Sequence, residues 1–169
     1  MTDEPRPAGV TPPVAVVFAA TTFVALTIGG LGVVSLVRDS DVITVAGLGP
    51  IPGVLGIVVS VALFSGILLW GLRASPPGYL TAVPCALGGY IGELGGIVLG
   101  GVVSGADLAR AVAAAASVAL GWPGAVIAVA ALASGAFGVF LARTRGGRPR
   151  WAWENDEDDD AGAAGTGIG

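Results

Sequence analysis

The sequence contains no histidine, no lysine and only one cysteine, Cys85. A single cysteine excludes an internal disulfide, and the absence of histidine excludes a zinc site built from Cys and His. The Ser-His-Asp and Cys-His arrangements of nucleophilic catalysis are likewise excluded for this chain acting alone. No phosphate-binding loop, HExxH, GxSxG or dinucleotide motif is present in the sequence. We therefore expect a protein that is not an enzyme and that carries no cofactor and no metal.

Charge is also scarce. Charged residues make up 12% of the 169 residues and hydrophobic residues 54%, whereas an average soluble domain is about 25% charged. Six of the twelve acidic residues lie between Glu154 and Asp160, so the net charge of −4 belongs to the tail, and no nucleic-acid partner is expected. The long uncharged runs indicate an integral membrane protein, with the lipid bilayer as its first partner. Arginine without lysine, together with 29 glycines, is typical of a GC-rich bacterial genome.

Four uncharged segments are long enough to cross the roughly 30 Å hydrocarbon core of a bilayer as helices. We place these spans at about residues 14–37, 54–72, 79–103 and 122–142. The apolar segment 42–53 is expected to be a loop at the interface. An alanine-rich helix at 108–120 is expected to be interfacial or partly re-entrant, because the Gly-Trp-Pro-Gly sequence at 121–124 interrupts it. The predicted fold is an all-α integral membrane protein, with four transmembrane helices in a compact bundle over residues 14–142.

Both ends of the chain are polar. Residues 1–13 and 143–169 are predicted to be disordered, because they have too little apolar surface to offset the entropy of ordering. The tail opens with residues that are expected to contact lipid headgroups and to set the topology: Arg143, Arg145, Arg148, Arg150, Trp151 and Trp153. Six arginines fall on one side of the four spans and two on the other, which predicts a plasma-membrane protein with both termini in the cytoplasm. The acidic block of the tail is either solvated or a docking segment for a basic partner.

The third predicted span is rich in glycine and contains one charged residue, Glu93, near its centre. The glycines recur about four residues apart and form a predicted helix-packing face: Gly88, Gly89, Gly92, Gly96 and Gly100. Small residues spaced in this way let a second helix approach closely, which matters in lipid because the hydrophobic drive between helices is missing there. We expect Glu93 to point into this helix contact and away from lipid.

Two interpretations of Glu93 are open. A carboxylate at the centre of a bilayer costs about 2.5–3.5 kcal/mol on insertion scales, so its presence indicates a structural or functional role. In the first interpretation Glu93 is protonated and hydrogen-bonded and has a structural role, with the hydroxyl of Tyr90 as a donor. In the second, Glu93 and Tyr90 form a site that binds a proton or a cation, as intramembrane ionisable residues often do.

Two functions follow from these features. The first is a small polytopic membrane protein of non-enzymatic type, which acts by helix–helix association as an accessory subunit or a homo-oligomer. The glycine face and the scarcity of polar groups favour it, and its partner is a second copy or another membrane protein. The alternative is an oligomeric proton- or cation-coupled transporter or channel that uses Glu93.

Overall fold

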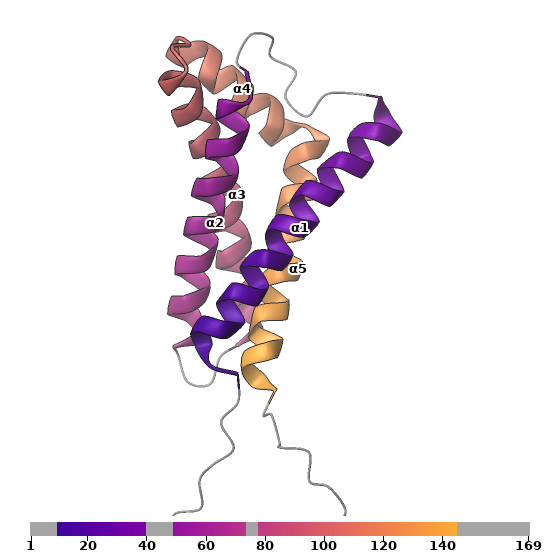
Figure 1. The fold of residues 1–169 in the computed structure, drawn as a ribbon, viewed down its shortest axis with the longest axis vertical. Coiled ribbons are helices and arrows are strands. Elements are labelled where there is room, and N and C mark those ends of the chain that lie inside the picture. Colours follow the sequence, from indigo (N-terminus) through magenta and orange to yellow (C-terminus); the bar gives the residue numbers. More distant parts are fainter. Residues whose placement is uncertain (1–9, 40–48, 74–77, 145–169) are drawn as a thin grey trace, which may run out of the picture.

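The computed structural model describes residues 10–39, 49–73 and 78–144, and every structural statement below refers to these ranges. They form five α-helices and no strand (Figure 1). Four elements are long and apolar enough to cross a membrane: α1 (Pro12–Arg38), α2 (Ile51–Leu72), α3 (Ala82–Val103) with the 3-10 turn Tyr79–Thr81 before it, and α5 (Trp122–Arg143). The predicted all-α fold with four membrane helices is therefore confirmed.

Proline sets the first turn of three of the long helices. Helices α1, α2 and α5 each carry proline at the first or second helical position. An N–H at that position has no acceptor within the helix, so proline removes nothing there and its fixed φ favours the helix. Helix α2 begins at Ile51, three residues before the predicted start, because Pro52 belongs to this first turn. The end of the predicted loop 42–53 is therefore helical.

The alanine-rich segment forms a separate helix, α4 (Leu108–Leu120). The carboxylate of Asp107 caps it by accepting a hydrogen bond of 2.8 Å from the backbone N–H of Arg110. Helix α4 ends at Gly121, whose extended backbone (φ −92°, ψ 176°) also precedes the first residue of α5. The chain therefore breaks its helix at the Gly-Trp-Pro-Gly sequence.

Helices α2 and α3 form the most extensive helix pair, while α5 packs against both α1 and α3 (Figure 1). The buried residues of α1 all lie between Ala15 and Thr27. Its second half diverges from the other helices, and Leu36 and Val37 are 84% and 80% exposed. The bundle is thus closed at the end where α1 begins and open at the end where α1 stops.

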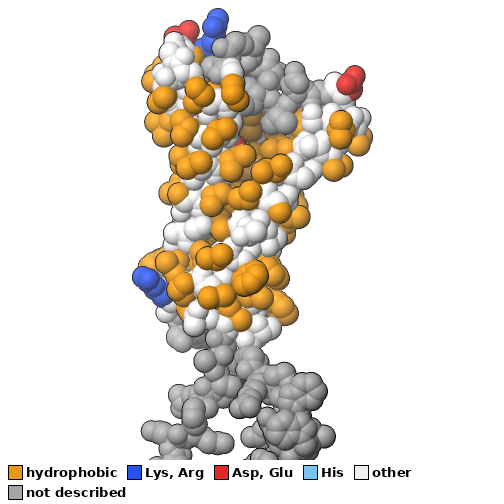
Figure 2. Space-filling view, in the orientation of Figure 1, with side chains coloured by type: hydrophobic (Ala, Val, Ile, Leu, Met, Phe, Trp, Pro, Cys, Tyr) orange, Lys and Arg blue, Asp and Glu red, His pale blue; other side chains and the backbone are white. Residues whose placement is uncertain are grey.

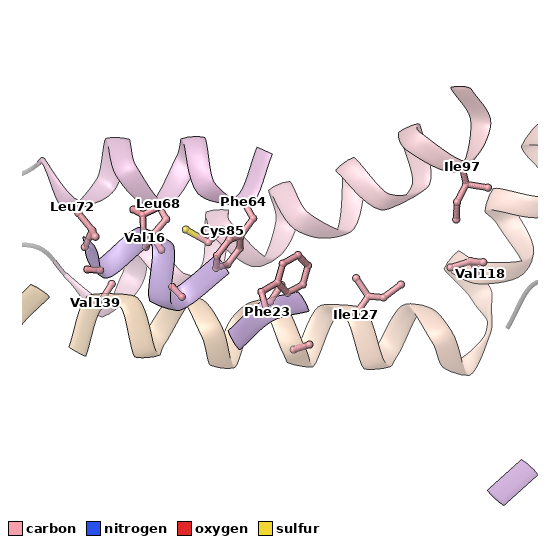
Figure 3. Close-up of a cluster of buried hydrophobic side chains, with 14 of the residues drawn as sticks. Val16, Phe23, Phe64, Leu68, Leu72, Cys85, Ile97, Val118, Ile127 and Val139 are labelled. Atoms are coloured by element: carbon pink, nitrogen blue, oxygen red, sulfur yellow. The ribbon is translucent and has the colours of Figure 1, made fainter. Parts of the chain in front are cut away.

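The closed end holds the best-packed part of the core. Phe23 of α1 stacks on Phe64 of α2 with ring centroids 4.9 Å apart, and Leu68, Cys85 and Val139 are fully buried around them (Figure 3). Hydrophobic side chains also cover the outside of the helices, whereas charged side chains gather at the two ends of the bundle (Figure 2). An apolar outer surface is what helices surrounded by lipid present.

Glycine brings α2 and α3 into backbone contact. A Cβ added at Gly92 would lie 2.8 Å from the Cα of Ser60, and one at Gly96 would lie 2.6 Å from the Cα of Gly56. One turn further on, a Cβ at Gly100 would lie 2.5 Å from the Cα of Pro52. Real Cβ atoms do not approach backbone this closely, so α2 can take this position only while these residues of α3 are glycine.

Replacing one of these glycines tests the contact. We expect Gly96→Ala to destabilise the bundle by about 1–3 kcal/mol, because the new methyl group meets the rigid backbone of α2. Gly95→Ala is the matched control, because a Cβ at Gly95 meets nothing within 4 Å. The measurement is unfolding of the purified protein in lipid–detergent micelles with increasing sodium dodecyl sulfate. Equal midpoints for the two variants would contradict the close contact.

Candidate functional site

Glu93 lies at the middle of α3 and is buried, with 5% of its surface exposed. Its carboxyl group rests against α2, where a Cβ added at Gly56 would lie 2.6 Å from its Oε1. The glycine at position 56 therefore makes the room that the carboxyl group occupies. The other oxygen, Oε2, is fully buried and has no hydrogen-bond partner among the described residues. A buried polar atom without a hydrogen-bond partner costs about 1–3 kcal/mol.

Tyr90 does not donate to Glu93, and that prediction is wrong. Its hydroxyl donates instead to the backbone carbonyl of Ala119 in α4, at 3.0 Å. The last four carbonyl groups of a helix accept no hydrogen bond within that helix, and inside a membrane there is little water to donate one. Tyr90 therefore satisfies a free carbonyl of α4, a contact that local sequence patterns do not reveal because the two residues are 29 apart.

Glu93 opens into a cavity of about 280 Å³. Its lining comes from all five helices and from the residue before α2: Leu31, Pro50, Gly53, Val54, Ile57, Glu93, Ile97, Val118 and Ile127. Ile97, Val118 and Ile127 form the buried part of the lining (Figure 3), whereas Pro50 and Val54 are exposed. None of the eight residues that accompany Glu93 is titratable, so among the described residues its carboxyl group is the only ionisable group in the lining.

The start of α2 places this cavity close to one end of the bundle. Gly56, which contacts Glu93, is six residues after Pro50. At 1.5 Å per residue, the carboxyl group is about 9 Å along the helix axis from the residue that precedes α2. The carboxyl group lies nearer this end than the backbone of Glu93 does, because the side chain extends to Gly56, which faces Gly96.

The C-terminal end of α4 forms another wall of the site. Val118 lines the cavity, and the next residue, Ala119, bonds Tyr90 one turn before Glu93. Gly124 lets the chain turn back closely, since a Cβ there would lie 2.6 Å from the carbonyl oxygen of Val118 and 3.2 Å from the ring of Tyr90. A helix C-terminus carries a partial negative charge. The first turn of α2, which also lines the cavity, carries the opposite partial charge, so the carboxyl group of Glu93 is the group that favours a positively charged occupant.

The predicted packing glycines do not share one neighbour. Gly92, Gly96 and Gly100 meet the backbone of α2, and Gly88 meets the side chain of Ile67, also in α2. Gly89 lies instead beside Ala131 of α5 and Phe23 of α1, with the carbonyl of Gly89 accepting a 2.6 Å hydrogen bond from the Ser60 hydroxyl. The stripe is therefore occupied inside the chain and is not a free surface for a partner.

Sequence reasoning missed the other half of this contact. Gly56 and Ser60 are spaced by four in α2, which is the small-xxx-small pattern that meets the glycines of α3. This spacing could have predicted the contact with α3 from the sequence, but α2 contains no charged residue that would mark it as unusual. Two other buried hydroxyls, those of Thr27 and Ser134, have no hydrogen-bond partner among the described residues.

Of the residues predicted to contact lipid headgroups, only Arg143 is described. Its guanidinium lies 5.0 Å from the centroid of the Tyr79 ring, a cation–π distance that joins the end of α5 to the turn before α3. The other five lie outside the described residues: Arg145, Arg148, Arg150, Trp151 and Trp153. The same holds for most of the two predicted terminal segments, and the orientation of the termini stays a prediction. Within the described ranges there is no group of three or more Cys, Asp or Glu side chains that could hold a metal ion.

The Tyr90 hydrogen bond can be tested by removing one oxygen atom. We expect Tyr90→Phe to lower the free energy of unfolding by about 1 kcal/mol, because the carbonyl of Ala119 loses its donor. Tyr79→Phe is the matched control, since Tyr79 is half-exposed at the end of the bundle and its ring remains available to Arg143. Both midpoints are measured by detergent unfolding in micelles. A Tyr90→Phe protein as stable as Tyr79→Phe would show that the bond contributes nothing.

Comparison with known proteins gives a family and no activity. A sequence profile described as a family of unknown function, DUF6121, matches residues 10–161, so the chain belongs to that family. The search of curated proteins and the search of solved structures found no match.

Proposed function

We propose that this member of the DUF6121 family is a non-enzymatic, proton- or cation-coupled transporter or channel in which Glu93 is the binding group. The observation that carries the proposal is the state of its carboxyl group. It is buried in the middle of α3, its Oε2 has no hydrogen-bond partner within the described ranges, and it faces a cavity shared by five helices.

A purely structural role accounts for Glu93 less well. A protonated carboxyl group that fastens two helices is expected to have both oxygens hydrogen-bonded, because each unmet bond in an apolar setting costs free energy. The donor that the sequence offered, Tyr90, is engaged by Ala119. Sequences break the rules of packing and polar satisfaction mainly at functional sites. The unmet oxygen and the space beside it therefore favour a binding role.

The shape of the bundle supports exchange from one end. Exposed Pro50 and Val54 line the cavity on the side where α2 begins, at about 9 Å and about 3 Å along the helix axis from Gly56, which contacts the carboxyl group. Toward the other end, the stacked rings of Phe23 and Phe64 and the buried Leu68 fill the space between helices. Transport then requires this core to open in a second conformation, whereas proton binding alone does not.

Carbodiimide labelling of Glu93 in native membranes tests the proposal. The reagent modifies protonated carboxyl groups that it can reach, so we expect rapid labelling at low pH that fades along a titration curve as pH rises. Glu93→Gln removes the labelled site, and we expect it to abolish proton or cation flux in liposomes with helix content unchanged by circular dichroism. No labelling of the folded protein at any pH, or full flux through Glu93→Gln, would overturn the proposal.

Association as an accessory subunit or homo-oligomer is the second candidate. A groove of about 500 Å³ runs between α1 and α5, and its lining is wholly apolar or glycine: Leu26, Gly30, Ala125, Val126, Val129, Ala130 and Ala133. A smooth apolar groove on an outer face accepts a helix of a second copy. This groove replaces the glycine face of α3 as the basis for association, because α2 already covers that face.

A bulky residue in the groove separates this candidate from the first. Val129 is 67% exposed in the groove, and Val58 of α2 is 56% exposed outside it. If the chain associates through the groove, Val129→Trp shifts the protein toward monomers, whereas Val58→Trp does not. Photobleaching steps of labelled protein in bilayers, at one protein-to-lipid ratio, give the distribution. An unmodified protein that is monomeric removes the second candidate and leaves the first untouched.

A further inference from the structure

The lining of the Glu93 cavity restricts the kind of cation that it holds. Among the described residues of the lining, Glu93 supplies the only side-chain oxygen, and the other side chains are aliphatic or absent. Calcium takes about six to eight oxygen ligands, and magnesium keeps an ordered shell of oxygen ligands and water. Apolar walls supply neither, and an apolar cavity holds water poorly. An inorganic ion would therefore lose its hydration at this site without gaining an equivalent set of ligands.

An organic ammonium ion matches the same lining. Its one positive charge pairs with the carboxylate of Glu93. Its apolar groups replace water against Leu31, Ile57 and Ile127. A cation that carries its own apolar surface needs no further oxygen ligands.

The cavity also sets the size of the ligand. Its volume of about 280 Å³ lies near the lower limit of small-molecule pockets, which are roughly 300–1,000 Å³. The lining is buried at Ile97, Val118 and Ile127 and exposed at Pro50 and Val54. The charge is therefore expected at the inner part beside Glu93, with the apolar body toward the exposed residues of α2.

We infer that the substrate class of this site is a small monovalent organic ammonium ion, which binds with its charge on Glu93 and its apolar body in the cavity. This inference rests on the proposed function, because it names the cation that exchanges with the proton of Glu93. Binding of the cation releases that proton, so charge is conserved: one positive charge leaves the carboxyl group and one replaces it.

The test uses the full chain in lipid nanodiscs and benzyltrimethylammonium as the probe. Its charge is permanent, so a change in pH titrates only the protein. We expect it to protect Glu93 from carbodiimide labelling, with the labelled residue identified by mass spectrometry and Glu93→Gln as the blank. Sodium and potassium at the same concentration are expected not to protect Glu93 from labelling. Neopentylbenzene, the neutral molecule of the same shape, is likewise expected not to protect it.

A matched pair of variants tests the location. Val54→Phe places a ring at the exposed part of the cavity lining, and we expect it to weaken protection by about tenfold or more, as steric misfit in an apolar pocket does. Val58→Phe, one turn further along α2 and outside the lining, is expected to leave protection unchanged. Labelling without the probe is expected to persist in both variants, and circular dichroism confirms that both are folded.

The outcomes distinguish failure of the organic-ammonium inference from failure of the proposed function. Labelling that titrates with pH, with equal protection by neopentylbenzene or by sodium, or with no protection by the probe, overturns the organic-ammonium inference and leaves Glu93 as a proton site. Equal protection in Val54→Phe and Val58→Phe places the probe elsewhere and also overturns it. Absence of labelling at every pH overturns the proposed function and this inference with it.

Discussion

The backbone contact between α2 and α3 is the constraint on which the other features depend. In lipid, helices gain little from burying apolar surface against each other, so close packing and hydrogen bonds must hold them together. Three glycines of α3 admit the α2 backbone, and the hydroxyl of Ser60 adds a buried bond to the carbonyl of Gly89. The same approach sets the carboxyl group of Glu93 against Gly56. The packing that stabilises the pair therefore also positions its one charged group.

The break between α4 and α5 gives the site its remaining wall. A single helix through this region would be too long for the membrane and would carry no free carbonyls beside Glu93. Because the helix stops at Gly121, the last turn of α4 lies beside the middle of α3, where Tyr90 bonds Ala119 and Val118 reaches the cavity. Interrupted helices place helix ends at membrane depth, where their partial charges act on ligands. At this cavity the C-terminal end of α4 and the first turn of α2 bring opposite partial charges, so the proposed cation site rests on Glu93.

The two ends of the bundle differ in how completely side chains fill the space between the helices. At the end where α1 begins, the stacked Phe23 and Phe64 and their neighbours are fully packed. At the other end α1 diverges, a cavity remains, and Oε2 of Glu93 has no hydrogen-bond partner among the described residues. One end is thus filled by side chains, and the other keeps the space that binding requires. Such a division is expected where a function needs an incompletely packed region, since well-packed cores do not admit ligands.

The sequence by itself determined the class of the protein, the four long apolar helices, the break at residues 121–124 and the presence of one carboxyl group inside α3. These features depend on local hydropathy and on glycine and proline, which act on the residues beside them. Only the tertiary structure decided that α2 covers the glycine stripe, that Tyr90 bonds Ala119 and not Glu93, and that five helices meet around a cavity. The hydrogen bonds from Ser60 to Gly89 and from Tyr90 to Ala119, both between helices of the described part of the chain, each join residues 29 apart. Contacts of that kind depend on how whole helices are offset and turned, which no short stretch of sequence specifies.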